Sequence, residues 1–255
     1  MSDSWLNPNE TDEMLSPIRA NGLKLLDIKP HQIGVDYGCG RGALLIPAAK
    51  QCKLMIGIDN TKESIKFLTN RIEEEKITNC CLFVRNIKEV ALDNAVDFSI
   101  VNGVLEWIPV KEKVDIRSYF RRRVPEFCVP EKNPLTLQLE FLKRVYSNLK
   151  QGGKLYLGIE NRYDWRYFLW KKDPHTNLMW TSIFPRRFAN LRCNLAYGRP
   201  YETYTYSPKA LKRLLLRAGF ASVSLYEALP SYHYPKRLRP LKNPLTGSII
   251  ALAIK

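Results

Sequence analysis

The residues best suited to hold a ligand lie where a short apolar strand runs into a helix. Three glycines, Gly38, Gly40 and Gly42, alternate with other residues directly after the strand over 32–37. Glycines let the backbone turn tightly and let a ligand approach the main chain without a Cβ clash. The helix that begins near Ala43 adds free N–H groups and the positive end of its dipole. This corner predicts a site for a ligand with a carboxylate or a phosphate.

An acid follows the second apolar strand and suits a ribose. Asp59 lies 23 residues after Asp36, close to the spacing at which an acid meets a ribose diol. A carboxylate can accept two charge-assisted hydrogen bonds from neighbouring hydroxyls. An N-cap of the helix that starts at residues 61–63 is the other interpretation, and one acid can serve both purposes.

The spacing of the glycines selects a family. Ala43 stands where a dinucleotide site would carry its third glycine. Together with Asp36, the Gly-x-Gly-x-Gly pattern resembles motif I of class I S-adenosylmethionine-dependent methyltransferases, although a strand–turn–helix corner without a ligand would look similar. The resemblance implies S-adenosylmethionine as cofactor. The cofactor-binding residues that it implies are Asp36, Gly38, Cys39, Gly40, Gly42, Asp59, Asn60, Asn86, Asn102 and Trp107. Asn86 departs from the acid that the family usually has at that place, and a core position is the alternative for Trp107.

The order of the elements predicts an α/β fold. Five apolar strands alternate with helices, which indicates a parallel, right-handed, doubly wound sheet. The end of the chain resembles the family's antiparallel last hairpin, so we expect a Rossmann-like, mostly parallel sheet of seven strands. A single methyltransferase domain over 1–255 is expected, with one or two N-terminal cap helices in 1–30. Two insertions are expected, at 109–133 and at 160–206, and the first carries three arginines at 121–123.

Composition excludes several classes of protein. A length of 255 residues suits one domain with additions. No run approaches the roughly 20 apolar residues of a membrane span, and the N-terminus does not resemble a signal peptide. The six cysteines form no Cys-x-x-Cys pair, so we predict neither a metal site nor disulfides, and a cytoplasmic location.

The charge of the chain is uneven. The net charge is +15, and residues 160–255 hold 17 Lys and Arg against 5 Asp and Glu. An anionic partner is therefore expected at the C-terminal part. A phosphate-bearing substrate, nucleic acid and peripheral contact with an acidic membrane all remain open, as does a merely solvated surface.

The second insertion suggests the acceptor. Glu160-Asn161-Arg162 after the fifth strand, with Asp173-Pro174-His175-Thr176 further on, resembles methyltransferases encoded among bacterial surface-polysaccharide and lipopolysaccharide genes. A histidine can take a hydroxyl proton near neutral pH. We therefore expect His175 as the catalytic base, with Glu160 as the alternative base or acceptor anchor. The substrate-binding residues expected are Arg162, Tyr163 and Arg166.

These residues favour transfer of a methyl group to a sugar hydroxyl of a glycan or glycan precursor. An RNA methyltransferase is an alternative, because basic and aromatic residues also interleave in RNA-binding proteins. A non-catalytic binding partner with the same fold is another. His233 could reach the site only if the loop near the C-terminus folds over it, and His31 precedes the first strand on the wrong side of the sheet.

Overall fold

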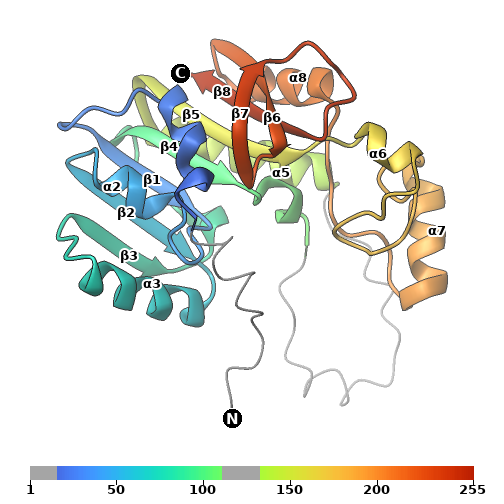
Figure 1. Ribbon diagram of the computed structural model, residues 1–255, viewed down its shortest axis with the longest axis horizontal. Helices are drawn as coiled ribbons and strands as arrows, with labels where there is room; N and C mark the ends of the chain where they lie inside the picture. The colour runs from blue at the N-terminus through green and yellow to red at the C-terminus, as the bar shows by residue number, and fades with distance from the viewer. Residues whose placement is uncertain (1–15, 111–132) are drawn as a thin grey trace.

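A computed structural model describes residues 16–110 and 133–255, and it builds them around one large sheet (Figure 1). The first insertion, including the arginines at 121–123, lies almost wholly outside the described residues, as do residues 1–15. The strands are β1 (Ile33–Tyr37), β2 (Leu54–Asp59), β3 (Cys80–Val84), β4 (Val96–Asn102), β5 (Leu149–Glu160), β6 (Ser222–Ser231), β7 (Tyr234–Pro240) and β8 (Ser248–Ile254). The α-helices are α2 (Leu45–Ala49), α3 (Lys62–Glu74), α5 (Pro134–Asn148), α6 (Trp165–Phe168), α7 (Arg186–Tyr197) and α8 (Pro208–Ala218). Three 3₁₀ helices complete the described elements: η1 (Pro17–Leu25), η2 (Ile87–Glu89) and η3 (Leu105–Trp107).

The sheet has the order β3-β2-β1-β4-β5-β8-β6-β7. Neighbours from β3 to β5 pair in parallel, whereas β8, β6 and β7 pair antiparallel. The doubly wound, mostly parallel sheet with an antiparallel end is therefore confirmed. The chain reverses its direction of winding between β1 and β4, and ligands of such folds bind outside the carboxyl ends of the strands at that point.

The number of strands differs from the seven that the sequence predicts. Residues 234–240 form β7 at the sheet edge and make the eighth strand. The sequence did not predict this strand, because its prolines and exposed basic residues are typical of loops. They also suit an edge, where one side of the strand has no partner to bind.

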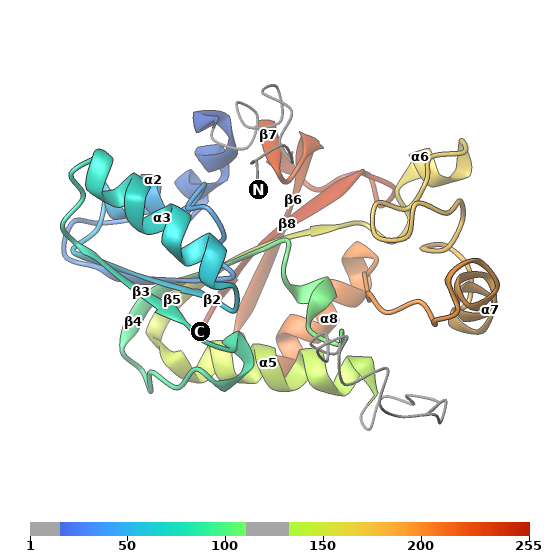
Figure 2. The ribbon, with the colours of Figure 1, turned by 90° about the horizontal axis from the view of Figure 1, so that it is seen from below.

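Helices cover both faces of the sheet and make three layers (Figure 2). η1, α2 and α3 pack on one face and α5 and α8 on the other, each with its own apolar cluster. α8 shows why these segments are helical. Ser207 caps it through a hydrogen bond from the Ala210 N–H, Pro208 starts it, and Gly219 ends it in the left-handed conformation.

Of the cap helices expected in 1–30, the described residues contain η1. Ser16 caps it, and Pro17 is its first residue. Asn21 donates a hydrogen bond to the Pro235 carbonyl at 3.3 Å, and the Tyr234 hydroxyl binds Ser16 at 3.1 Å. These contacts hold η1 against β7, the strand that the sequence did not predict.

The second insertion leaves the carboxyl end of β5 and carries α6 and α7 (Figure 1). The buried Asn161 side chain donates to the carbonyls of Pro244 and Thr246, which ties the start of the insertion to the loop before β8. Arg162 donates to the carbonyls of Ser182 and Phe184 and so fixes a turn further along the insertion. Asn161 and Arg162 thus bind backbone, and Glu160 alone of the Glu-Asn-Arg motif faces the candidate site.

Candidate active site

The glycine corner is shaped to admit a ligand at its middle position. All three glycines have positive φ angles: 74° at Gly38, 50° at Gly40 and 82° at Gly42. A Cβ on Gly38 would meet Val104, and one on Gly42 would meet Leu68, so packing requires glycine at both. A Cβ on Gly40 would meet no atom of the described residues within 4 Å. Gly40 therefore borders open space into which its backbone faces, and this is the cradle that a ligand needs.

Asp59 organises this corner. One carboxylate oxygen accepts a hydrogen bond from the Gly40 N–H at 2.9 Å, and the other accepts from the N–H and hydroxyl of Thr61. Thr61, and not Asp59, is the N-cap of α3, so the alternative interpretation of Asp59 as the N-cap is wrong. Asp59 supports the helix start through its hydrogen bonds from Thr61. Each carboxylate oxygen can accept more than one hydrogen bond, so the ribose role is compatible with these contacts and stays a prediction.

Asp36 is a buried acid in an unfavourable setting. Its side chain is 4% exposed, and no hydrogen bond to its carboxylate is found in the described part of the chain. Burial, together with the negative charge of Asp59, raises the pKa of Asp36 to about 8. A cationic ligand group beside it would favour the ionised form, and S-adenosylmethionine carries an ammonium group.

The remaining expected cofactor residues differ in what they contact. Asn86 caps η2, because its amide oxygen accepts the Lys88 N–H at 3.0 Å. Asn102 has a buried amide oxygen with no hydrogen-bond partner in residues 16–110 and 133–255, which leaves that acceptor available. Cys39 is buried, whereas Asn60 is exposed. The cofactor roles of these four residues stay predictions.

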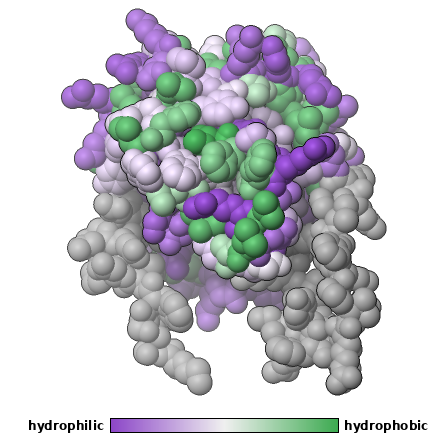
Figure 3. All heavy atoms as spheres, turned by 90° about the vertical axis from the view of Figure 1, so that its right-hand side faces the viewer, coloured by the Kyte–Doolittle hydropathy of each residue, from purple (hydrophilic) through white to green (hydrophobic). Residues whose placement is uncertain are grey.

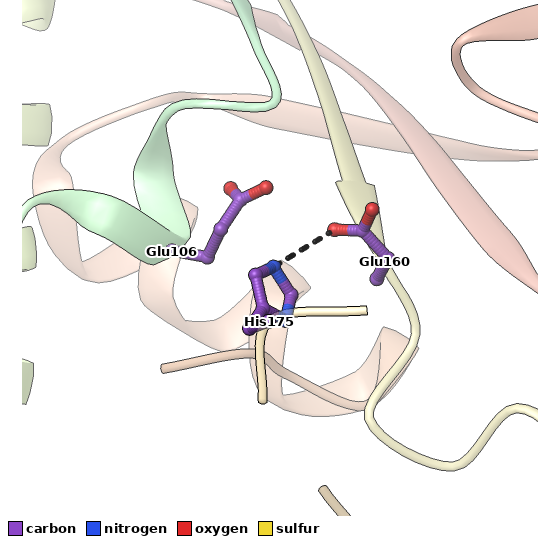
Figure 4. Close-up of side chains that lie close together, drawn as sticks. All are labelled: Glu106, Glu160 and His175. Carbon is purple, nitrogen blue, oxygen red and sulfur yellow. Dashed lines mark ion pairs between the residues drawn. The ribbon is translucent and has the colours of Figure 1, made fainter. Parts of the chain in front are cut away.

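The two predicted catalytic residues lie side by side. His175 comes from the second insertion and Glu160 from the end of β5, and their Nε2 and Oε2 atoms are 3.7 Å apart (Figure 4). The other ring nitrogen, Nδ1, lies 3.2 Å from Asp173 Oδ1. Trp107, 47% exposed, packs edge-on against the His175 ring and is therefore a wall of this site, not a core residue.

Asp173 is held as an anion. Burial opposes its ionisation, but hydrogen bonds from His175, Ser182 and Tyr201 outweigh burial and lower the pKa of Asp173 to about 2. An ionised Asp173 favours a proton on Nδ1 of His175. In that tautomer Nε2 is the acceptor nitrogen of the ring, and it faces Glu160.

A second carboxylate and a tyrosine complete the cluster, and the sequence did not single them out. Glu106, 1% exposed, points toward Glu160 and His175 (Figure 4). The Tyr232 hydroxyl lies 3.0 Å from Glu160 Oε1 and 3.3 Å from Glu106 Oε1. Burial and the neighbouring Glu160 raise the pKa of Glu106 well above its ordinary value. An acid inside the apolar run over 104–108 was the available sequence signal for Glu106.

His233 also reaches the cluster. Its Nε2 lies 3.8 Å from Glu160 Oε1, and its ring packs on Tyr232. The turn between β6 and β7 therefore folds over the site, which is the condition under which the sequence allowed His233 a role. We call Glu106, Glu160, His175, Tyr232 and His233 the acid–histidine cluster.

The turn after β4 joins the cluster to the glycine corner. Val104 lies where a Cβ on Gly38 would be, so this turn packs on the corner. One residue earlier, a Cβ on Gly103 would meet Tyr232 and His233, so the same turn packs on the cluster. A ligand in the corner and a second molecule at the cluster would therefore be neighbours.

The expected substrate-binding residues have partners within the protein. Arg162 binds backbone carbonyls and lies over the Tyr163 ring, and Arg166 forms an ion pair with the buried Asp164 at 2.7 Å. Both guanidinium groups thus support the insertion. Substrate binding by Arg162, Tyr163 and Arg166 stays a prediction. A substrate that binds these side chains would have to do so alongside their contacts within the protein.

A cavity of about 350 Å³ opens next to the cluster. Its lining residues come from η1 and from the β6–β7 hairpin, and they are Arg19, Pro230, Ser231, His233, Tyr234 and Lys236. The buried Arg19 Nε has no hydrogen-bond partner among the described residues. The cavity thus offers a cation to an anionic group, and His233 is its wall toward the cluster.

The cluster also holds donor atoms of the kind that bind metals. Glu106, Glu160 and His175 each offer one ligand atom, and these atoms lie within 4.8 Å of one another. The sequence predicts no metal site, but that prediction rests on the spacing of the cysteines. It does not consider a site made of carboxylates and a histidine. The absence of a metal site therefore stays a prediction.

Comparison with known proteins identifies the family. A model of the methyltransferase domain matches residues 28–178, a range that contains the glycine corner, Glu106, Glu160 and His175. The chain belongs to this family and is an S-adenosylmethionine-dependent methyltransferase. The corner fits that cofactor, because Gly40 leaves room at the backbone, and Asp36 and Asp59 lie beside it.

Relatives of several activities resemble the chain. It is 27% identical over 141 residues to a Methanococcus vannielii protein named as a probable cobalt-precorrin-6B C(15)-methyltransferase (decarboxylating). The matched region covers 54% of this chain and 78% of the relative. A Methanosphaera stadtmanae protein named as ribosomal RNA small subunit methyltransferase A is 32% identical over 123 residues, or 48% of this chain and 41% of the relative. Matches to other cobalt-precorrin enzymes, such as that of Methanococcus maripaludis strain C7, span only 40% of the relative.

Solved structures share the fold. A methyltransferase from Thermotoga maritima superposes with a TM-score of 0.55 at 16% identity, over 97% of this chain and 95% of that one. Phosphoethanolamine N-methyltransferase 1 of Haemonchus contortus superposes with a TM-score of 0.60 at 14% identity, over 97% of this chain and 45% of that one. None of the helices in the part of the chain that the structure describes is long and apolar enough to cross a membrane.

Proposed function

We propose that this methyltransferase transfers its methyl group to a hydroxyl of a sugar in a glycan or glycan precursor. The observation that carries the proposal is the array of Asp173, His175 and Glu160, in which a buried anion orients a histidine whose free nitrogen faces a second carboxylate. A sugar hydroxyl is a poor nucleophile until a base takes its proton, and this array supplies a base.

The chemistry follows from the positions of these groups. S-adenosylmethionine supplies an electrophilic methyl group on its sulfonium. His175 Nε2 takes the hydroxyl proton of the acceptor, and Asp173 stabilises the imidazolium that forms. The distance of 3.7 Å between Nε2 and Glu160 Oε2 is that of a loose ion pair and exceeds a hydrogen bond, so an acceptor hydroxyl would bind between the two groups in place of a weak contact. Aligning the oxygen with the methyl carbon and the sulfur supplies the rest of the catalysis.

A proton on Glu106 makes this cluster compatible with its burial. Two ionised carboxylates sharing Tyr232 in a buried site would repel each other, and burial together with Glu160 raises the pKa of Glu106, which favours a proton on Glu106. Glu160 is then the carboxylate that anchors the acceptor, through a second hydroxyl or through the proton that His175 carries after transfer.

The cavity beside His233 favours an acceptor with an anionic group. Arg19 and Lys236 line it, and the buried Nε of Arg19 has no hydrogen-bond partner in the described part of the chain. A phosphate or carboxylate carried by the acceptor would suit these cations. This fits a sugar phosphate or an acidic sugar, and it agrees with the resemblance to methyltransferases of surface-polysaccharide genes.

RNA methylation is the second candidate. It rests on the 32% identity to a relative named as a ribosomal RNA methyltransferase and on the excess of basic residues. The cluster argues against it, because a base is required for a hydroxyl acceptor more than for the amino groups that many RNA enzymes methylate.

Mass spectrometry of cell-surface glycans, with and without the gene, tests the proposal. We expect one O-methyl group per repeating unit or per precursor to disappear on deletion and to return with the wild-type gene. Complementation with His175→Ala should fail to restore it. Unchanged glycans together with a lost methyl mark on ribosomal RNA would replace the proposal by the second candidate.

A further inference from the structure

The second insertion exposes an unusual amount of apolar surface. Of the fourteen large hydrophobic side chains that are exposed in the described residues, nine belong to residues 163–197. Those nine are Tyr163, Trp165, Phe168, Leu169, Trp170, Phe188, Leu191, Leu195 and Tyr197. Soluble proteins rarely collect so many apolar side chains at one end unless that surface meets a partner.

Helix α7 has the geometry of an interfacial helix. Ala189 and Cys193 are buried against the rest of the insertion. Phe188, Leu191 and Leu195 are spaced by three and four residues, so they share one helix face, which points away from the protein. Leu195, in the last turn of α7, is 81% exposed, which is high for a leucine.

Basic residues flank this apolar face, and few acids compete with them. Arg187 and Arg192 lie on either side of the stripe formed by Phe188, Leu191 and Leu195, as the helical spacing requires. The acids of the insertion are engaged within it: Asp164 and Asp173 are buried, and Glu202 pairs with Arg199 at 3.0 Å. The surface presented outward is therefore apolar and cationic.

The same end of the molecule carries α6 beside α7 (Figures 1 and 2). Trp170, which follows α6, packs on Trp180, and the Arg192 guanidinium of α7 lies over the same Trp180 ring. These contacts link the exposed apolar residues of α6 to those of α7. Figure 3 views this end and shows green apolar side chains interspersed with purple polar ones.

We propose that the face formed by Trp165, Phe168, Leu169, Trp170, Phe188, Leu191 and Leu195 binds the surface of an anionic membrane. Leucine and phenylalanine enter the boundary between headgroups and acyl chains, tryptophan lies at the headgroups, and arginine binds lipid phosphates. A second copy of the chain fits less well, because two cationic faces would repel each other.

Membrane binding by this face would limit the class of acceptor that the enzyme can reach. His175 lies in the chain between α6 and α7, so docking brings the catalytic insertion to the lipid surface. Resting on the proposed function, this points to a glycan that is attached to a lipid.

Co-sedimentation with vesicles tests the membrane site without cofactor or glycan. The wild type should bind vesicles of phosphatidylcholine that contain phosphatidylglycerol, and bind pure phosphatidylcholine at least tenfold more weakly. The double variant Leu191→Asp, Leu195→Asp should lose at least tenfold in binding. Leu216→Asp is the matched control, since Leu216 is an exposed leucine of α8, and it should bind as the wild type does.

Thermal melting and S-adenosylhomocysteine binding establish that the variants are folded. Absence of binding to both vesicle types, or equal binding by the double variant, would overturn the membrane site. So would a wild-type dimer that the double variant converts to a monomer, because the face would then be a protein interface. None of these results depends on glycan methylation, so a failure here leaves the proposed function to its own test.

Discussion

At the scale of single residues, the proposed catalysis depends on His175. Its Nδ1 contacts the anionic Asp173 and its Nε2 faces Glu160, so one nitrogen is fixed and the other is free to accept a proton. The position and the tautomer of the His175 ring follow from Asp173. The Asp173 carboxylate is held in place by hydrogen bonds from the His175 backbone N–H, Ser182 and Tyr201. The sequence showed the two acids and the histidine, but only the fold shows that they meet.

Replacing this histidine should separate chemistry from cofactor binding. His175→Ala is expected to lower turnover by roughly 10²–10⁴-fold, the usual contribution of a general base, while S-adenosylhomocysteine affinity stays nearly unchanged. Steady-state kinetics and calorimetry measure the two effects. Retention of more than about a third of wild-type turnover would remove His175 as the base and leave that role to Glu160.

Asp36 should make the stability of the ligand-free enzyme depend on pH. Because folding raises its pKa from 3.8 to about 8, the folded protein holds this proton more tightly than the unfolded chain does. The contribution of Asp36 to stability is therefore present below about pH 4 and is lost progressively as the pH rises to about 8. The loss is at most about 1.4 kcal/mol per pH unit.

The variant Asp36→Asn isolates this effect, since it stays neutral throughout. Melting curves from about pH 5 to 8 should show the variant gaining stability relative to the wild type as the pH rises. A constant difference across that range would mean that Asp36 titrates normally, and the ammonium-binding role would lose its physical basis.

At the scale of elements, we propose that the glycine corner positions the cofactor. Packing explains the glycines at 38 and 42, whereas the space beside Gly40 is open among the described residues, as a bound ligand would require. The sequence motif indicated all three glycines alike, and it could not distinguish these two reasons.

Two matched substitutions test that distinction. Gly40→Val should abolish S-adenosylhomocysteine binding in a protein that still folds, because the new side chain fills the open space. Gly152→Val is the control, since Gly152 also has a positive φ, 75°, and also has no neighbour within 4 Å of a built Cβ. Calorimetry should find normal affinity in the control. Equal loss in both variants would assign the effect to backbone strain.

The elements also show where sequence reasoning ends. The helix signals of α8 and the last strand over 248–254 were readable, because caps and an apolar run act locally. β7 was not, since its prolines and basic residues resemble a loop and its pairing with β6 is a tertiary contact. Glu106 and Tyr232 were missed for the same reason, as their meeting depends on the β6–β7 turn folding over β4.

At the scale of the whole molecule, the positive charge is concentrated in the C-terminal part. Residues 160–255 contain 17 basic and 5 acidic residues. Many of these cations have internal tasks, such as Arg162 and Arg166 in the insertion. Others surround the apolar face of α7. The charge is thus divided among discrete sites and forms no continuous basic helix.

This distribution predicts weak binding to RNA. Affinity for a generic RNA duplex or single strand should be low at physiological salt and fall steeply as salt is added, because only phosphate contacts contribute. Filter binding or anisotropy over a salt series measures it. A sub-micromolar complex at physiological salt would instead favour an RNA substrate.

The most direct measurement follows the methyl group itself. Enzyme, S-adenosylmethionine with a deuterated methyl group and an extract of glycan precursors are incubated, and mass spectrometry with fragmentation locates the label. The account predicts a labelled methyl on a sugar oxygen with the wild type, a trace of it with His175→Ala, and none with Gly40→Val. Label on a base of RNA or on a nitrogen, or equal labelling by His175→Ala, would contradict it.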